Sequence, residues 1–451
     1  RREKADPEAS MLRSVLSATM VAALALPSTS AFSLLAAPTS VVLRSSLRSS
    51  LPLAKSASLA TSRTASRRST MPAAGLSMMA VPQKDIAVGI VGPGLVGGEL
   101  WKQIEATQDK LKAAGLNVKV AAVSNRKDNK AWMMCNEGGI SFKEYEAGMT
   151  DPKAGEEGDF LKMAEFIKKV GGGRAVMFDT TAAEAVSDMY APWLEAGVHV
   201  CTPNKKVGSG PLARYKRCKE AVSEGKALWG METTVGAGLP IINVLQTDLI
   251  GTGDEIKTIE GIFSGTLSYI FNTFKPGDKF SDVITDAKNK GFTEPDPRDD
   301  LGGVDVARKV VILARECGLD VELDDVPIKS LVPAELQSWS PKEGEVLADA
   351  FIEQMKAYDD EKTKLMQDAV DKGQVLRYVG KVDVAAKKVT VELAMYPKTH
   401  PFAGTQYADN ICCFNTARYV PQPLVIQGPG AGAAVTAAGI YADFLKIAKT
   451  L

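Results

Sequence analysis

One segment near residue 90 restricts the fold of this chain more than any other. A short apolar run, Asp85 to Val91, leads directly into the sequence GPGLVG, and an amphipathic segment from Glu99 to Ala114 follows. This order of strand, G-x-G-x-x-G turn and helix is typical of a dinucleotide-binding unit, in which the glycines permit a tight turn and a close approach to a pyrophosphate. An ordinary glycine turn is the alternative. The candidate cofactor-binding residues are Gly92, Gly94, Leu95, Val96 and Gly97.

The segment after this helix bears on the choice of cofactor. An apolar run from Val118 to Val123 predicts the second strand, and Ser124-Asn125-Arg126-Lys127 follows where an NAD-specific site would carry Asp or Glu for the ribose 2′-hydroxyl. Arg126 and Lys127 could instead bind a 2′-phosphate. The pattern favours NADPH and leaves NADH open as a second cofactor. The alternative is a solvated loop with two ordinary surface charges.

Two further apolar runs predict the third and fourth strands of a parallel sheet. They are residues 175–178 and 198–201, which lead into DTT at 179–181 and TPNKK at 202–206. Because ligands of open α/β sheets gather at the carboxyl ends of strands, we expect Thr181 and Lys205 to lie at the nicotinamide. The two histidines, His199 and His400, have no catalytic partner nearby and are expected to be structural.

The distribution of charge excludes one class of partner. The 54 basic and 54 acidic residues balance, but residues 11–84 carry eight basic residues and no acidic one. Residues 85–451 therefore carry 43 basic and 51 acidic residues, a net charge of −8. An acidic body argues against nucleic acid, which needs a basic surface. The six cysteines include no C-x-x-C pair, so we expect neither a disulfide framework nor a zinc site.

The first 84 residues are predicted to be a targeting presequence. An apolar run from Met20 to Leu26, followed by small residues up to Phe32, has the layout of a signal peptide and is too short for a stable membrane span. Residues 33–80 are rich in Ser, Ala, Leu and Arg and contain no acid, as in transit peptides. The two parts resemble the bipartite presequences of algae with secondary plastids. We therefore expect a plastid location and a mature chain beginning between Ala73 and Asp85. Mitochondrial or secretory delivery and a plain disordered tail are the alternatives.

A cluster of carboxylates lies in the second half of the chain. The sequence TEPDPRDDLGGVDVARK, residues 293–309, places five acidic residues within twelve positions on a Pro-rich loop that runs into a helix. Such a cluster suits recognition of an ammonium group. A solvated acidic loop is the alternative, and a calcium site is a weaker one because the spacing does not follow the EF-hand. The five residues are Glu294, Asp296, Asp299, Asp300 and Asp305.

The segment from Gly303 predicts a helix. Asp305 and Lys309 are four residues apart, so their side chains share one face. Such a pair is usually a surface ion pair of small worth. A carboxylate beside a lysine could also place an ammonium group to deliver a proton. The expected apolar stripe of this helix consists of Val304, Ala307, Val311 and Ala314.

Six ordered motifs together resemble homoserine dehydrogenase over residues 85–451. They are VGPGLVGG, TPNKK, TVGAGLP, GIFSGTLSYIF, the TEPDPRDD block with its DVARK helix, and VIQGPGAGAAVTA. The likeness is to the monofunctional, fungal type. It implies an NADPH-dependent oxidoreductase that reduces L-aspartate-4-semialdehyde to L-homoserine, on the route to threonine, methionine and isoleucine. No aspartate kinase domain is expected before residue 85, and no regulatory domain after residue 451.

The resemblance also implies roles for individual residues. Lys309 corresponds to the lysine that gives a proton to the substrate carbonyl, Lys205 to the lysine at the nicotinamide and substrate, and Asp305 to the acid near the reacting group. Substrate binding is implied for Glu294, Asp299, Asp300 and Thr266. A cofactor contact is implied for Gly432. A monovalent cation, usually sodium, is implied at Glu232, Val235, Ala237 and Leu239, mostly through backbone carbonyls.

We therefore expect an α/β fold in which a Rossmann-like dinucleotide-binding domain, residues 85–240, is completed by residues 426–451. The inserted α+β region, residues 241–425, would bind substrate, form a homodimer and include a helical insertion over about residues 341–374. Aspartate-semialdehyde dehydrogenase is a competing hypothesis, but it needs a nucleophilic Cys with a His partner, and Cys201 with His199 is poorly placed. An inactive NADP-binding regulator should have lost Lys205 or Lys309, and both are present.

Overall fold

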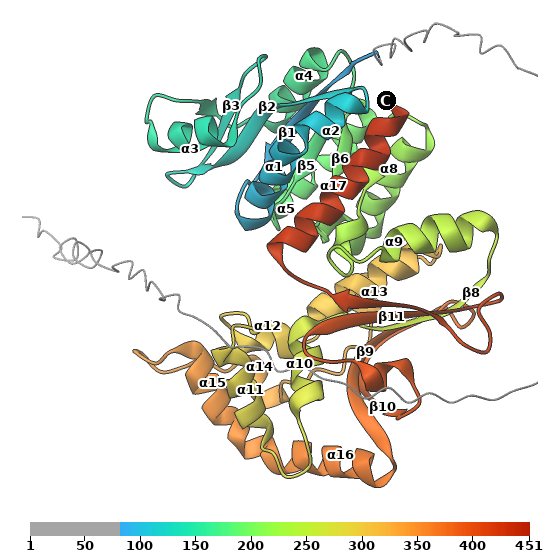
Figure 1. The fold of residues 1–451 in the computed structure, drawn as a ribbon. Coiled ribbons are helices and arrows are strands. Elements are labelled where there is room, and N and C mark those ends of the chain that lie inside the picture. Colours follow the sequence, from blue (N-terminus) through green and yellow to red (C-terminus); the bar gives the residue numbers. More distant parts are fainter. Residues whose placement is uncertain (1–81) are drawn as a thin grey trace, which may run out of the picture. The chain divides into compact units, whose positions relative to one another are not determined.

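The computed structural model describes residues 82–451, which form two β-sheets with helices packed on them (Figure 1). The predicted targeting presequence lies outside the described residues, except for residues 82–84. Among the helices of residues 82–451, none is both long and apolar enough to cross a membrane.

The first sheet is mixed, and in the described chain it has seven strands in the order β4-β3-β2-β1-β5-β6-β7. β1 pairs in parallel with both β2 and β5, and β6 and β7 continue the parallel part, whereas β3 and β4 are antiparallel. A parallel sheet with helical crossovers is the architecture expected of a dinucleotide-binding fold. The strands are β1 (Lys84–Val91), β2 (Leu116–Lys127), β3 (Lys130–Cys135), β4 (Glu156–Glu157), β5 (Ala175–Asp179), β6 (His199–Cys201) and β7 (Trp229–Gly230).

Helices cover both faces of the first sheet, which explains why its central strand is apolar throughout. Ile86, Val88 and Ile90 of β1 belong to the core under α1, α2 and α17, whereas Ala87 and Val91 face the core under α4, α6 and α8. Figure 1 shows the last helix, α17 (red), against α1 (blue). The helices are α1 (Leu95–Ala106), α2 (Gln108–Ala113), α3 (Phe142–Thr150), α4 (Phe160–Val170), α5 (Glu184–Ser187), α6 (Tyr190–Glu195), α7 (Lys206–Ser209), α8 (Leu212–Ser223) and α17 (Ala433–Thr450).

Two predicted elements of this sheet differ from the structure. The predicted helix 99–114 begins earlier, at Leu95, and is split by Thr107, whose hydroxyl lies 2.8 Å from the Gln103 carbonyl oxygen. The predicted strand 118–123 extends to Lys127, because residues 122–127 pair with β3 in a hairpin. The prediction that Arg126 and Lys127 follow the strand in a loop is therefore wrong, since both lie within it.

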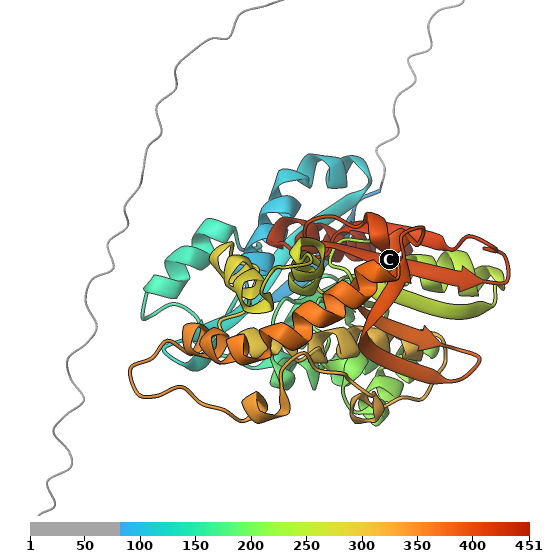
Figure 2. The same cartoon turned by 90° about the horizontal axis from the view of Figure 1, so that it is seen from below.

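The second sheet is antiparallel, with the order β10-β9-β8-β11-β12 among the described strands. Its strands are β8 (Ile256–Ile262), β9 (Gln374–Asp383), β10 (Lys388–Pro397), β11 (Asp409–Thr416) and β12 (Leu424–Pro429). Figure 2 shows it from below, with the orange helices α15 and α16 of the predicted insertion. The helices are α9 (Ile241–Asn243), α10 (Gly265–Thr273), α11 (Phe280–Asn289), α12 (Pro297–Leu301), α13 (Val304–Glu316), α14 (Ala334–Gln337), α15 (Leu347–Met355) and α16 (Asp359–Asp371). A π-helix, η2 (Val244–Leu249), continues α9, and the short 3-10 helices are η1 (Glu232–Thr234), η3 (Ile250–Thr252), η4 (Leu323–Asp325), η5 (Lys356–Tyr358) and η6 (Pro401–Gly404).

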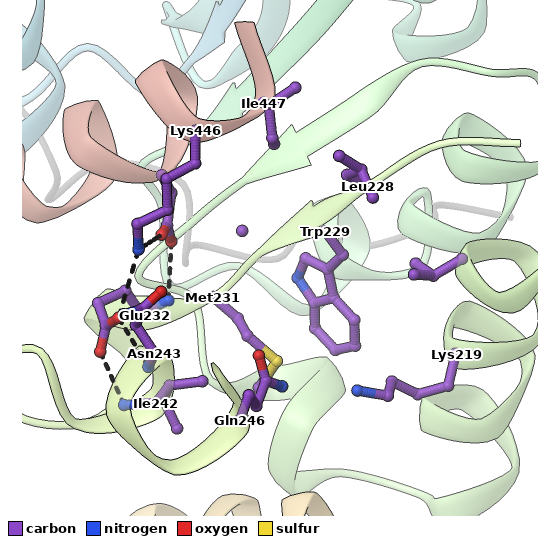
Figure 3. Close-up of a pocket in the computed structure, with 13 residues that line it drawn as sticks. Lys219, Leu228, Trp229, Met231, Glu232, Ile242, Asn243, Gln246, Lys446 and Ile447 are labelled. Atoms are coloured by element: carbon purple, nitrogen blue, oxygen red, sulfur yellow. Dashed lines mark hydrogen bonds and ion pairs between the residues drawn. The ribbon is translucent and has the colours of Figure 1, made fainter. Parts of the chain in front are cut away.

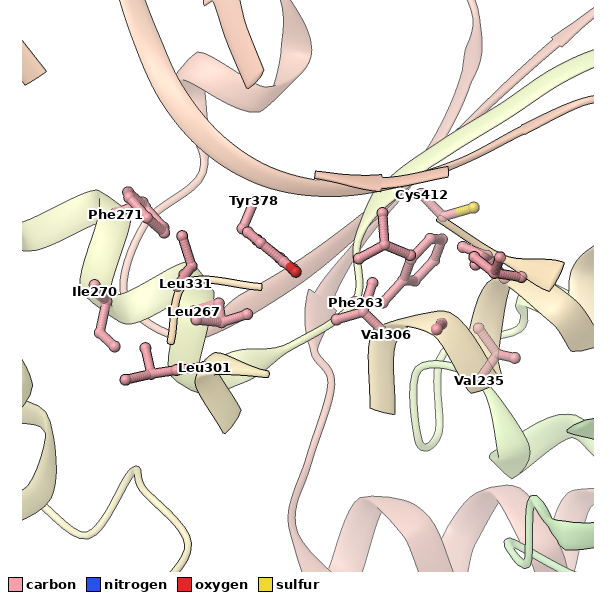
Figure 4. Close-up of a cluster of buried hydrophobic side chains, with 14 of the residues drawn as sticks. Val235, Phe263, Leu267, Ile270, Phe271, Leu301, Val306, Leu331, Tyr378 and Cys412 are labelled. Carbon is pink, nitrogen blue, oxygen red and sulfur yellow. The ribbon is translucent and has the colours of Figure 1, made fainter. Parts of the chain in front are cut away.

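The core between this sheet and its helices fixes α13. Figure 4 shows Val306 of α13 with Phe263 after β8, Leu267 of α10 and Tyr378 of β9 among the buried side chains. Ala307, Val311 and Ala314 of the predicted stripe are fully buried. Val304 is 44% exposed, so its place in the stripe was predicted wrongly, because the first residue of α13 projects beyond the core.

Candidate active site

The glycine turn joins β1 to α1 and leaves no space for a side chain at Gly92 or at Gly97. Gly92 has a φ of +75°, and a Cβ there would lie 2.3 Å from Cγ2 of Thr181. A Cβ on Gly97 would lie 2.4 Å from Oγ1 of Thr180 and 2.9 Å from the Gly92 carbonyl oxygen. The close approach of the turn to the end of β5 therefore requires glycine at both positions.

The first turn of α1 presents open backbone donors. Gly94 is its N-cap, no side chain caps it, and within residues 82–451 the N–H groups of Leu95, Val96 and Gly97 meet no acceptor. The side chain of Leu95 is 88% exposed. Free N–H groups at the positive end of a helix fit the pyrophosphate of a dinucleotide.

Three charged side chains meet between the first sheet and α13. Lys205 follows β6 and precedes α7, whereas Asp305 and Lys309 lie on the first and second turns of α13. The Asp305 carboxylate forms ion pairs with both ammonium groups, with Oδ1 3.3 Å from Lys205 Nζ and Oδ2 2.8 Å from Lys309 Nζ. Lys309 Nζ also donates to the Phe263 carbonyl oxygen at 2.5 Å. The structure thus joins residues that are 100 positions apart in the chain.

Burial and mutual contact shift the pKa values of this trio. Burial lowers the pKa of Lys205 below its ordinary value, and the carboxylate of Asp305 opposes this only in part. Burial raises the pKa of Asp305, but the ammonium groups of Lys309 and Lys205 outweigh it and hold that pKa well below its usual range. Asp305 is therefore an ionised carboxylate between two lysines.

A cavity of about 250 Å³ lies beside the trio and is lined mainly by acids. The side chains of Glu294 and Asp299 are exposed, and neither has an ion-pair partner among residues 82–451. Unpaired carboxylates around a small cavity favour a cationic group such as an ammonium. The lining residues are Ser264, Glu294, Asp299, Asp300, Asp305 and Val306.

The other acids of the cluster hold the loop in place. Asp300 accepts the backbone N–H of Glu294 at 2.8 Å, and its Oδ1 lies 2.8 Å from the hydroxyl of Thr266. Burial raises the pKa of Asp300 above its usual value. Asp296 caps α12 and pairs with Arg298 at 2.7 Å, so it belongs to the loop and does not line the cavity.

Arg126 and Lys127 point to different partners. The Lys127 ammonium donates to the carbonyl oxygens of Gly148 and Asp151 at the end of α3. The guanidinium of Arg126 is exposed and makes one long bond, 3.3 Å to the Asn129 carbonyl oxygen. Of the two residues predicted to bind a 2′-phosphate, Arg126 keeps most of its donors free, whereas Lys127 spends two of its three on carbonyl oxygens at the end of α3.

The remaining predicted cofactor contacts lie at element ends. Thr181 follows β5, and its N–H and hydroxyl both donate to Oδ1 of Asp179, at 2.8 and 2.7 Å. Gly432 is the N-cap of α17, and Gln103 of α1 donates to the nearby Ala434 carbonyl oxygen at 3.0 Å. The first turn of α17 is thus held against the C-terminal half of α1.

The predicted cation residues lie on the turn between η1 and α9. Both carboxylate oxygens of Glu232 accept backbone N–H groups, from Ile242 at 2.7 Å and Asn243 at 2.9 Å, and Lys446 Nζ lies 3.7 Å away (Figure 3). Burial raises the pKa of Glu232 to about 7. The carbonyl oxygens of Val235 and Ala237 accept no hydrogen bond within residues 82–451. Buried, unpaired carbonyls suit a hard cation, whereas the carboxylate is already engaged.

Three residues are excluded from the chemistry, and one was missed. Cys201 is fully buried, and burial raises the pKa of its thiol well above the ordinary value, so it cannot act as a nucleophile. His199 accepts the N–H of Leu228, which precedes β7, and His400 accepts the N–H of Phe402 in the same turn, so both imidazoles serve structural hydrogen bonds. Ser264 lines the acidic cavity and caps α10, a role that the Ser-Gly-Thr start of that helix could have indicated.

Comparisons with known proteins agree with this arrangement. The family model described as "Homoserine dehydrogenase, NAD binding domain" matches residues 92–232, and "Homoserine dehydrogenase" matches residues 240–445. The chain is 42% identical over 376 residues to homoserine dehydrogenase of Schizosaccharomyces pombe, covering 82% of this chain and 97% of that one. It is 46% identical over 368 residues to the chloroplastic bifunctional aspartokinase/homoserine dehydrogenase 1 of Arabidopsis thaliana, covering 80% of this chain and 39% of that one.

The chain thus spans about two fifths of the length of the bifunctional plant relatives that it matches. A crystal structure of a protein of unknown function from Candida auris is 38% identical, with a TM-score of 0.73, and the match covers 81% of this chain and 99% of that one. The family that the six sequence motifs indicated is confirmed, together with its α/β fold and NAD(P)-binding domain. The chain belongs to the homoserine dehydrogenase family.

Proposed function

We propose that this chain reduces L-aspartate-4-semialdehyde to L-homoserine with NADPH, in the biosynthesis of threonine, methionine and isoleucine. The observation that carries the proposal is the contact of Lys205, Asp305 and Lys309 beside a cavity lined by unpaired carboxylates. In this proposal residues 85–240 and 426–451 bind the dinucleotide, and residues 241–425 bind the amino-acid substrate.

The lysines supply what the carbonyl oxygen needs during reduction. When bound, the cofactor supplies a hydride to the aldehyde carbon. Lys309 spends two of its three N–H donors on Asp305 and the Phe263 carbonyl oxygen, which leaves one to give its proton to the developing alkoxide. Lys205 stabilises the same oxygen. General acid catalysis of this kind typically contributes ~10²–10⁴ in rate.

The acidic cavity selects the substrate by its α-ammonium group. Glu294 and Asp299 offer carboxylates without partners in the described chain, and Asp300 with Thr266 fixes the loop that carries them. A carboxylate–ammonium contact in a small cavity is a charge-assisted hydrogen bond. We therefore expect the desamino analogue of the aldehyde to be reduced poorly.

A direct assay tests the activity. Purified protein is mixed with L-homoserine and either NADP⁺ or NAD⁺, and formation of the reduced nicotinamide is followed by absorbance. We expect turnover with homoserine, faster with NADP⁺, and none with L-serine. Reduction of aspartyl phosphate in place of the semialdehyde would favour the competing semialdehyde dehydrogenase and refute the proposal.

The backbone carbonyls of Val235 and Ala237 support a monovalent cation, sodium, at the turn after η1. Glu232 and Leu239 stay in the proposed site through the family resemblance alone, since the Glu232 carboxylate and the Leu239 carbonyl oxygen already accept backbone N–H groups. The cation would hold the turn that leads from the first sheet into α9. A thermal-shift series with sodium or choline chloride at equal ionic strength tests it. We expect a higher Tm in sodium, and equal Tm values would refute the site.

A homodimer is supported by the exposed edge of the second sheet. In the described chain β12 pairs only with β11, and Val425 on it is 38% exposed. An open edge strand is a template for pairing with another chain. Light scattering should give a mass close to twice the 48.0 kDa of one chain, and a single-chain mass at micromolar concentration would contradict the dimer.

Delivery to a plastid is supported by the acid-free sequence of residues 11–84 and by the word "chloroplastic" in the names of the plant relatives. The test is a fluorescent fusion of Met11–Lys84 in a cell with a secondary plastid. We expect plastid fluorescence that is lost in the Phe32→Ala variant. Fluorescence in mitochondria would support the alternative location instead.

A further inference from the structure

A fully buried carboxylate, Asp179, closes β5 behind the candidate active site. Its Oδ1 accepts the N–H and the hydroxyl of Thr181, and its Oδ2 accepts the Tyr190 hydroxyl at 2.6 Å and the Asn204 amide at 2.9 Å. Asp179 and Tyr190 have no exposed surface, and Asn204 is 3% exposed. Four donor groups thus face the two oxygens of this carboxyl group, and the Tyr190 hydroxyl also lies 2.7 Å from Oγ1 of Thr202.

The two oxygens of Asp179 serve two different turns. Oδ1 holds Thr181, whose methyl group lies against Gly92 in the glycine turn. Oδ2 holds Asn204, the residue directly before Lys205. One buried side chain therefore links the cofactor turn to the lysine turn.

Hydrogen bonds hold the backbone on both sides of Lys205. Oδ1 of Asn204 accepts the Lys206 N–H at 3.0 Å, and the Asn204 N–H donates to Oγ1 of Thr202 at 2.9 Å. The carbonyl oxygen of Lys205 accepts the N–H of Ser209 at 2.9 Å. Hydrogen bonds thus fix the residue before Lys205, the residue after it and its own carbonyl group.

We propose that Asp179 and Asn204 are positioning residues, which fix the backbone of Lys205 so that its ammonium meets Asp305 beside the substrate cavity. The proposal rests on the proposed function of Lys205 and concerns how that function depends on a buried network. It also separates two effects. Bonds to Oδ2 act on Lys205 and hence on kcat, whereas bonds to Oδ1 act on the cofactor turn and hence on the KM of the cofactor.

Asn204→Ala removes the amide that joins Asp179 to the lysine turn. A misplacement of about 1 Å can cost ~10²-fold in rate, so we expect kcat to fall by ~10–10²-fold. The dissociation constant of NADPH, measured by nicotinamide fluorescence, should change less than about twofold. Tyr190→Phe, which keeps the buried ring, should show the same pattern to a smaller extent.

Asn204→Asp gives a signature that a merely structural role would not produce. It keeps the acceptor for the Lys206 N–H but sets a second carboxyl 2.9 Å from Asp179. Two such carboxyls must share one proton. We expect activity near that of the unaltered enzyme at acid pH and a loss as pH rises, whereas Asn204→Ala stays impaired at every pH. A pH profile parallel to that of the unaltered enzyme would overturn the proposal.

Ser281→Ala is the matched control. Ser281 is buried, and its hydroxyl donates to Oδ2 of Asp359 at 2.7 Å, outside the candidate active site. We expect its Tm to fall about as much as that of Asn204→Ala while kcat is kept. If Asn204→Ala also keeps kcat, the network is only structural and the proposal is overturned.

An NMR titration of Lys205 in protein with ¹³C-labelled lysine distinguishes this proposal from the proposed function, because it needs no turnover. Loss of the contact with Asp305 should lower the pKa of Lys205 in Asn204→Ala. An inactive unaltered enzyme would refute the proposed function. An unchanged Lys205 titration would refute the positioning.

Discussion

The glycine turn follows β1, and the ion trio meets beyond the end of β6, two strands away in the same sheet, yet the two are built in opposite ways. The turn offers backbone N–H groups within six consecutive residues, of which three are glycines. The trio and its acidic cavity consist of side chains from four segments, around residues 205, 264, 294 and 305. We therefore expect the glycine turn to lose cofactor binding when an added side chain fills the space beside its backbone. The ion trio should lose catalysis when a single charged side chain is removed.

The largest effect is expected from Lys309→Ala. We predict that kcat falls by at least ~10²-fold, because the lysine acts in the transition state. The dissociation constant of NADPH should stay within about twofold, since no contact links Lys309 to the glycine turn. Steady-state kinetics with fluorescence titration checks both. Near-normal turnover would show that Lys309 is not the proton donor. It would also contradict the expectation that the ion trio depends on each of its charged side chains.

A smaller effect, on binding alone, is expected from Gly94→Ala. In the protein a Cβ there would have its nearest neighbour 4.0 Å away, the Gly92 carbonyl oxygen, so the Tm should not change. If the backbone needs this space for the pyrophosphate, NADPH should bind about tenfold more weakly, a change of about 1.4 kcal/mol. Gly97→Ala is the comparison variant, because its Cβ would clash within the protein and lower the Tm as well. Unchanged NADPH affinity in Gly94→Ala would contradict backbone recognition.

A selective effect is expected from Arg126→Ala, with Lys127→Ala as its matched control. We predict that kcat/KM with NADPH drops several-fold while that with NADH is kept, because the exposed Arg126 guanidinium has most of its donors free for a 2′-phosphate, whereas the Lys127 ammonium is held at the end of α3. Lys127→Ala should alter stability through α3 and leave the ratio of the two cofactors unchanged. Equal losses with NADPH and NADH would show that Arg126 does not bind the 2′-phosphate.

The smallest expected effect is a displacement of the pH profile in Asp305→Asn. The carboxylate of Asp305 raises the pKa of Lys205 against the effect of burial, so its removal lowers that pKa further. Reduction needs a charged ammonium beside the oxygen, and it declines as pH rises through this pKa. The decline should therefore start at lower pH in the variant. If the decline begins at the same pH in the variant as in the unaltered enzyme, the titration of Lys205 does not cause the pH dependence of the reaction.

Much of the first sheet could be predicted, because β1, β5 and β6 are buried on both faces and show as unbroken apolar runs. The end of β2 could not, since Asn125, Arg126 and Lys127 are polar and are held in a strand only by pairing with β3. Helical periodicity placed Val304 in the apolar stripe of α13, although its side chain is exposed. The start of the buried stripe depends on the packing of α13 against β9, which the spacing of apolar residues does not show.

In the candidate site, too, local features could be predicted from the sequence, whereas contacts between distant residues could not. The glycine turn follows from local spacing, because one short segment carries all its donors. Asp305 and Lys309 could be paired by helical periodicity, but no spacing in the sequence brings Lys205 to them from 100 residues away, and only the family resemblance did so. Asp179 and Tyr190 gave no pattern at all, since buried polar networks join residues that the chain keeps apart.

The packing of α17 has a consequence for the order in which the protein can assemble. Phe444 of α17 packs edge-on against Phe178 of β5, with ring centroids 5.5 Å apart, and Ile440 shares that core with Ile86 of β1. A ribosome makes β1 about 350 residues before α17. The part of the first sheet that α17 covers, beside α1 and α2, therefore stays uncovered through nearly all of synthesis. The earliest-made part of the molecule would be the last to mature, and in that interval its apolar face is the surface on which a chaperone would act.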